Sequence, residues 1–325
     1  MAVRNYLPRV PTGRRRFWWA VLASLLSAFL WATYYLFVLW VAPTTAPSAT
    51  LAYPFLFGGI AYTGWAVARG DGRSLAAVWR APSAYPRVAL LFGMQVSVLA
   101  TTYLAGPVDA SLLSLIGDVV LTPIVVALWI GTYRSHIATP VFALGLVVSL
   151  AGGTMAIVGG RSLSAVHGWA WLAVTGVPVT VAFYFLLTAR ENRHTPPAAV
   201  VGQSTLAAAV LMVLFAPVFP GGYAGLVTVA PVPLFLLALC GITSFFLAPV
   251  LYFLALNDVG FVLPPMLMTG IPVFTLLLSA GVLGIALPIV GVLGIPVAVG
   301  GAVLALRGES VFPPESPPVP PVPGR

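Results

Sequence analysis

Ten apolar stretches, each long enough to cross a membrane as a helix, follow one another along this chain of 325 residues. A helix spans the hydrocarbon core with about 20 apolar residues, whereas a barrel strand would alternate in character over about 10 positions. With only 7% charged residues, the chain lacks the polar surface that a soluble protein of this length needs. We therefore predict an all-α integral membrane protein with ten transmembrane helices. The spans fall near residues 17–42, 48–68, 88–106, 110–131, 140–159, 168–189, 198–219, 233–256, 260–282 and 286–306.

The second half of the chain repeats the first at a shift of 149 or 150 positions. Matches of Trp, Tyr, Asp and Pro carry the most weight, because Ala, Leu and Gly recur by chance in apolar sequence. These matches are Trp19 with Trp169, Tyr34 with Tyr184, Tyr103 with Tyr252, Asp109 with Asp258, and Pro123 with Pro272. Each half contains an odd number of spans, so the second half must be inserted upside down relative to the first. The sequence thus predicts two inverted five-helix repeats, an arrangement typical of transporters whose substrate site lies between the halves.

Basic residues gather on one side of the predicted membrane. All fifteen are Arg, and with the N-terminus inside, every one except Arg161 falls in a cytoplasmic segment. This predicts a multi-pass protein of the cytoplasmic (inner) membrane with both termini in the cytoplasm. The net charge of +8 is then explained by topology and by anionic membrane lipids rather than by nucleic acid.

These features divide the chain into five predicted segments. They are a basic cytoplasmic N-terminus at 1–16, a first repeat at 17–159, an external loop at 160–167, a second repeat at 168–307 and a disordered Pro-rich cytoplasmic tail at 308–325. We also expect a short interfacial helix within the cytoplasmic loop 69–87.

Asp118 is the one acidic residue predicted to lie deep in the membrane, and its repeat partner is Leu267. A carboxyl group in an apolar bundle is costly to ionise, so it can take up and release a proton near neutral pH. Asp118 is therefore the candidate coupling or cation-binding group. The alternative is a protonated carboxyl that hydrogen-bonds to a neighbouring helix.

Several polar and aromatic side chains on the predicted spans are candidates for a substrate pocket. Aromatic rings at membrane depth can line a site for apolar, aromatic or cationic solutes, and their alternative role is the interfacial belt. The amides of Gln95 and Gln203 need partners in a bilayer, and helix-to-helix hydrogen bonds are their alternative role. The coupling and substrate-binding candidates are Asp118, Gln95, Trp31, Tyr34, Tyr103 and Tyr184.

Proline interrupts the fourth span and its repeat partner, the ninth. Pro123 and Pro272 each remove a backbone hydrogen bond, and such paired breaks in matching helices indicate a substrate site. Gly145, Gly152 and Gly301, on the fifth and tenth spans, instead suit close packing between helices of the two repeats.

Short motifs in these spans resemble the drug/metabolite transporter (DMT) superfamily, in particular its EamA-like family. They are Phe29-Leu30-Trp31-Ala32, the segment from Ala110 to Ile124, Ala151-Gly152-Gly153 and Gly270-Ile271-Pro272-Val273-Phe274. The chain departs from the family by lacking the Gly-Glu-basic pattern after helices 4 and 9. The resemblance implies a small-molecule permease, often an exporter, with a central cavity between helices 1, 3, 4, 6, 8 and 9.

The predicted function is secondary-active transport of a small metabolite or drug-like solute, with protons as the candidate coupling ion. We predict no enzyme, no cofactor and no metal site, since the three His residues are scattered over different loops. The expected activity is efflux of a small-molecule substrate, and membrane lipids are expected to surround the protein. The alternatives are a flippase for lipid-linked sugars or lipids, and a non-catalytic membrane scaffold.

Overall fold

The computed structural model describes residues 14–104, 106–121, 139–159, 170–191, 195–259, 263–268, 270–284 and 289–310. The described part of the first half forms α1 (Arg14–Val41), α2 (Pro47–Ala68), α3 (Gly72–Arg80), α4 (Ala84–Leu104), α5 (Pro107–Leu115), the π-helical η1 (Ile116–Leu121) and α8 (Pro140–Gly159). The second half forms α9 (Ala170–Glu191), α10 (Pro197–Leu214), the 3₁₀ turn η3 (Ala216–Val218), α11 (Gly222–Val227), α12 (Pro231–Cys240), the π-helical η4 (Gly241–Leu247), α13 (Ala248–Val259), α14 (Leu263–Met268), α15 (Gly270–Leu283) and α16 (Ile289–Ser310).

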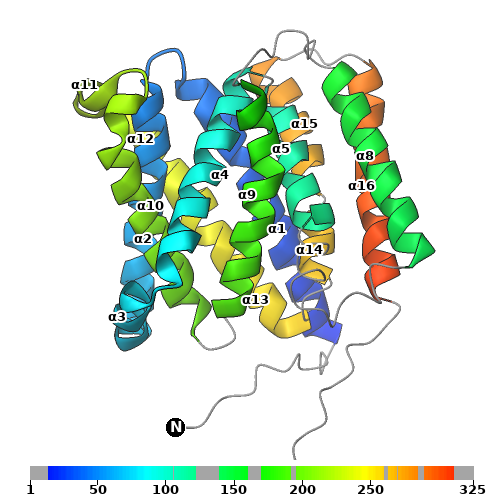
Figure 1. Cartoon of the computed structure of the whole chain (residues 1–325), viewed down its shortest axis with the longest axis horizontal. Helices are drawn as coiled ribbons and strands as arrows, with labels where there is room; N and C mark the ends of the chain where they lie inside the picture. Colours follow the sequence, from blue (N-terminus) through cyan, green and yellow to red (C-terminus); the bar gives the residue numbers. More distant parts are fainter. Residues whose placement is uncertain are drawn as a thin grey trace, which may run out of the picture.

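The protein is a multi-pass membrane protein built from these helices (Figure 1). Four apolar helical stretches are long enough to cross a membrane, Phe17–Val41, Pro47–Ala68, Ala84–Leu104 and Pro231–Ala255, and shorter apolar helices accompany them. Large apolar side chains such as Leu144, Val147 and Leu293 are exposed on α8 and α16. In a bilayer these side chains face lipid, so their exposure carries no hydrophobic cost.

The short helix predicted within the loop 69–87 is present as α3, which packs Leu75 and Val78 against Ala199 and Val200 at the start of α10. Its position at the membrane interface stays a prediction. The helix lies at one end of the bundle, opposite the end that carries α11 (Figure 1). At the other terminus, α16 continues past the predicted boundary at 307 to Ser310. The predicted external loop 160–167, most of the N-terminal segment 1–16 and the tail beyond 310 lie outside the described residues.

Glycines bring α8 and α16 into close contact along one edge of the bundle (Figure 1). A Cβ atom on Gly145 would collide with the backbone of Ala305, and one on Gly152 with the backbone of Ala298. From the other helix, Gly301 meets the backbone of Ser149. The predicted packing role of these glycines is confirmed, and it joins the first half of the chain to the second.

Two of the predicted spans are not continuous α-helices. The fourth begins as α5 and passes into the π-helical η1, and the eighth contains the π-helical η4 between α12 and α13. Irregular backbone at membrane depth is tolerated where it lies within protein, and π-helical turns are frequent at functional sites.

Candidate functional site

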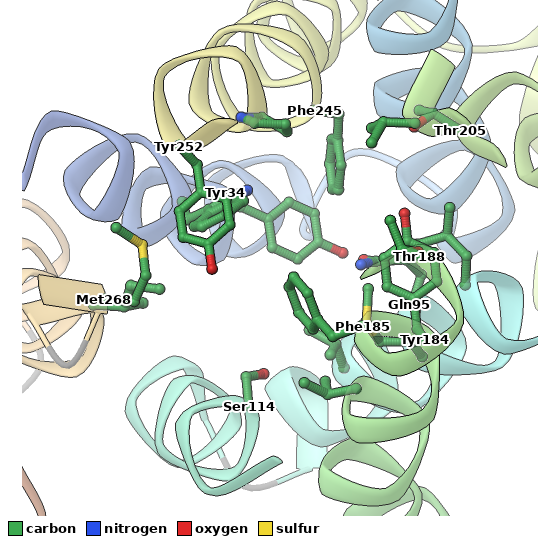
Figure 2. Close-up of a pocket in the computed structure, with 18 of the residues that line it drawn as sticks. Tyr34, Gln95, Ser114, Tyr184, Phe185, Thr188, Thr205, Phe245, Tyr252 and Met268 are labelled. Carbon is green, nitrogen blue, oxygen red and sulfur yellow. The ribbon is translucent and has the colours of Figure 1, made fainter. Parts of the chain in front are cut away.

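A cavity of about 150 Å³ lies in the middle of the helix bundle (Figure 2). Its walls come from both halves of the chain, with α1, α2, α4 and α5 from the first half and α9, α10, η4, α13, α14 and α15 from the second. Figure 2 shows Tyr34 near the middle of this space, with Met268 on the left of the view and Thr188 on the right. The cavity therefore has the position that the repeat pattern predicted, between the halves.

Nine of the 22 residues that line the cavity are aromatic. The Tyr34 and Phe245 ring centroids are 5.2 Å apart in a T-shaped arrangement, and Phe55 lies 4.1 Å from Phe245. On the other side, Trp31 lies 5.5 Å from Tyr252. Such contacts hold each ring in a fixed orientation, so the wall presents a preformed aromatic surface to a solute.

Phe245 owes its position to close backbone packing between α2 and η4. A Cβ on Gly58 would lie 2.6 Å from the Phe245 Cβ and 2.8 Å from the Gly241 carbonyl oxygen. On the other face of η4, the Ser244 hydroxyl donates to the Leu30 carbonyl of α1 at 2.9 Å. The π-helical turn is thus held by helices of the first half while its Phe245 ring enters the cavity wall.

A small number of polar groups interrupt the aromatic wall. The Ser114 hydroxyl donates to the Ala110 carbonyl at 2.9 Å, so the Tyr35 hydroxyl, 3.1 Å from Ser114, is the donor in that second bond. Gln95 is buried, and its Oε1 has no hydrogen-bond partner among the described residues. A buried acceptor without a partner costs free energy, so this amide is available to a donor on a bound solute.

Four of the predicted site residues line the cavity, namely Trp31, Tyr34, Gln95 and Tyr184. Tyr103 is not among its lining residues and instead packs against the hydrophobic core that contains Tyr34. Asp118 lies in η1, which follows the lining residues Ser114 and Leu115, but its side chain is outside the described part of the structure. Pro123 also lies outside the described residues.

Pro272 is buried within α15. Its neighbour Ile271 lines the cavity, as does Met268 at the end of α14. Thr269 lies outside the described residues, so the predicted interruption of the ninth span stays a prediction.

The sequence analysis missed a buried polar group, because it placed Arg87 in a cytoplasmic loop. The structure corrects this assignment: Arg87 lies in the first turn of α4 with no exposed surface. Its Nη2 donates to Gln203 Oε1 at 2.9 Å and its Nε to Ser204 Oγ at 2.9 Å. The predicted helix-to-helix hydrogen bonding of Gln203 is thereby confirmed. Arg87 lies one residue before the predicted span 88–106, so the sequence analysis assigned it to the loop, whereas α4 already begins at Ala84.

Comparison with known proteins finds a family match in the second half of the chain. Residues 167–307 match the model of the EamA-like transporter family, and the predicted resemblance is confirmed over this region. No curated protein matches the chain. A solved structure titled only "Crystal structure of protein" is similar in fold, with a TM-score of 0.65 and 22% identity, over 88% of this chain and 96% of that one.

Proposed function

We propose that this chain, whose second half belongs to the EamA-like transporter family, is a secondary-active transporter of a small aromatic solute that works by alternating access. The match to this family supports a membrane transporter of the DMT type. The observation that carries the proposal is the aromatic cavity between the two halves of the chain. Alternating access requires such a site, which one half exposes to either side as it moves against the other.

The pairing of helices supports two inverted repeats. α1 packs on α13, and the repeat partner of α1, which is α9, packs on α4. α2 packs on its own partner α10, and α8 on its partner α16. A two-fold axis in the membrane plane explains this set of pairs. It exchanges the α1–α13 contact with the α9–α4 contact, and it maps the α2–α10 and α8–α16 contacts onto themselves.

Cavity size and chemistry favour a solute with a single aromatic ring and little charge. A cavity of about 150 Å³ is close to the size that holds one benzene molecule in an engineered protein core. The described lining residues include no Asp, Glu, Lys or Arg. A lipid-linked phosphate would need cationic groups there, so the lining favours solute transport over lipid flipping. The unpartnered acceptor of Gln95 favours a solute that carries one hydroxyl or amine.

We further propose export as the direction of transport, which the family resemblance implies, and proton coupling through Asp118. Asp118 belongs to the π-helical η1, directly after two cavity-lining residues on the same span. An ionisable residue at membrane depth marks an ion or proton pathway by default.

The test is transport by the purified protein in proteoliposomes that contain a pH-sensitive dye. Phenols, aromatic amines and aromatic amino acids are expected to change the internal pH when added, and aliphatic solutes of equal size are not. Uptake of radiolabelled solute without a pH change would support the transport function and contradict proton coupling. A response to no member of the panel by either readout would reject the proposed function.

Asp118→Asn is expected to abolish the pH change while leaving solute exchange between the two sides. The amide keeps the size of the carboxyl group but carries no exchangeable charge, so exchange of bound solute survives without coupling. Asp109→Asn is the matched control, because Asp109 lies at the start of the same span in α5. Equal pH responses from wild type and Asp118→Asn would contradict the coupling role.

A further inference from the structure

A cluster of polar residues joins α4 of the first half to α9 and α10 of the second. Besides its bonds to Gln203 and Ser204, Arg87 places Nη1 3.6 Å from Glu191 Oε2. The same carboxylate oxygen accepts a hydrogen bond from the Ser83 hydroxyl at 2.8 Å. We call these five residues, Ser83, Arg87, Glu191, Gln203 and Ser204, the Arg87 cluster.

The Arg87 cluster lies at one end of the cavity. On α4, Arg87 stands four residues before the lining residue Leu91, and on α9, Glu191 stands three residues after Thr188. Spacings of three and four residues share one helix face, so both side chains continue the cavity wall by one turn. Arg87 is also close enough to the lining residue Tyr184 for the two to interact electrostatically.

This end of the cavity is the one that carries α3, and it faces the cytoplasm in the predicted topology. α4 begins there directly after α3, α9 ends there with Glu191, and α10 begins there beside α3. Every partner of Arg87 in the cluster belongs to the opposite half of the chain. A movement of one half against the other at this end therefore separates Arg87 from its partners.

The corresponding positions at the opposite end carry no such charges. Residues one repeat away from Arg87 and Glu191 are Leu236 and Val41, at shifts of 149 and 150. Removing a guanidinium from water is costly, and an ion pair is seldom more stabilising than apolar packing of the same size. The charges are therefore better explained by a contact that must open than by stability alone.

Arg87 is not fully hydrogen-bonded, which favours separation of its contact with Glu191. Its Nη1 makes no hydrogen bond within the described residues, although Glu191 lies nearby. The Glu191 side chain is 21% exposed, while that of Arg87 is fully buried. Water can therefore hydrate the Glu191 carboxylate when it separates from Arg87. Of the partners of Arg87, Glu191 is thus the one that we expect to separate first.

From this geometry we propose that the Arg87 cluster is the cytoplasmic gate of the transporter, closed in this conformation. Solute passes between the cavity and the cytoplasm when the Arg87–Glu191 contact opens. This inference rests on the proposed function, since a gate has a purpose only in a protein that transports. Its test below needs no substrate, so the two can fail separately.

The experiment measures how fast a single thiol in the cavity reacts with a membrane-impermeant, charged thiosulfonate reagent. Cys240, the one natural cysteine, is replaced by Ala, and Thr205→Cys places a thiol in the cavity wall. Glu191→Gln then removes the charge while keeping the size and an acceptor for Ser83. We expect cytoplasmic-side labelling in inside-out vesicles to accelerate at least about fivefold, the effect of a modest coupling free energy.

Two further variants separate gating from general loosening. Arg87→Lys keeps the charge but loses the fork that reaches Gln203 and Ser204, so it should also accelerate cytoplasmic labelling. Arg80→Gln removes an exposed charge on α3 and should leave the rate unchanged. Unchanged rates in both Glu191→Gln and Arg87→Lys, or an equal rise in right-side-out vesicles, would overturn the gate. Faster labelling in a protein that transports no solute would uphold the gate as a moving contact and reject the transport proposal.

Discussion

Replacing Gly301 by Ala is expected to destabilise the folded protein by about 3 kcal/mol, at the upper end of overpacking costs. The new Cβ atom would lie against the backbone of Ser149 and 2.7 Å from the Val148 carbonyl carbon, and neither neighbour is a flexible side chain. Relief therefore requires α8 and α16 to move apart along their whole contact. The measurement is the thermal unfolding midpoint of the purified protein in detergent.

Gly300→Ala is the matched control on the same helix. A Cβ on Gly300 meets no atom within 4 Å, and Ala is the better helix former by about 1 kcal/mol. Its unfolding midpoint should stay constant or rise. If the two substitutions shifted the midpoint equally, the close contact between α8 and α16 would not exist in the folded protein.

The glycine contact shows why much of the fold follows from the sequence. Apolar length determines where a helix can cross the membrane, and small residues at recurring spacings determine where two helices can approach. Both signals are local, so Gly145 and Gly152 could be assigned to helix packing without coordinates.

The site itself was only partly predictable. Trp31, Tyr34 and Gln95 were proposed because their polar groups are costly to bury at membrane depth unless a partner or a solute binds them. Tyr103 satisfied the same rule, yet it lies outside the cavity wall. The rule depends on depth along the helix, whereas lining a cavity depends on rotation about the helix axis and on the neighbouring helices. Phe245 and Met268 were missed for the same reason, since each looks like ordinary apolar span sequence.

Arg87 illustrates a different limit. Positive residues near span ends are assigned to cytoplasmic loops, and that rule concerns orientation rather than burial. Its two hydrogen-bond partners are more than a hundred positions away in sequence, on α10. A single sequence contains no signal for such a contact, although the buried amide of Gln203 required some partner. Long-range polar contacts between the halves therefore have to come from the structure.

Gln95→Leu is expected to lower transport about tenfold while making the protein more stable, and the two effects have one cause. The buried Oε1 of Gln95 has no partner among the described residues, which costs about 1–3 kcal/mol in the folded state. Leucine has a similar size and no polar atom, so it removes this cost and should raise the unfolding midpoint. It also removes the acceptor for the solute, and the loss of about 1.4 kcal/mol of binding free energy corresponds to a factor of ten.

The opposite signs distinguish a binding residue from a structural one. A structural amide would lose stability and transport together when replaced, because both depend on the same folded state. Met94→Leu, at the adjacent cavity position, is the matched control and should change both quantities little, since volume-conserving apolar exchanges are well tolerated. The two measurements are the initial rate of solute uptake into proteoliposomes and the thermal unfolding midpoint. A lower midpoint in Gln95→Leu would show that the amide holds helices together, and the polar half of the proposed solute site would have to be sought elsewhere in the cavity wall.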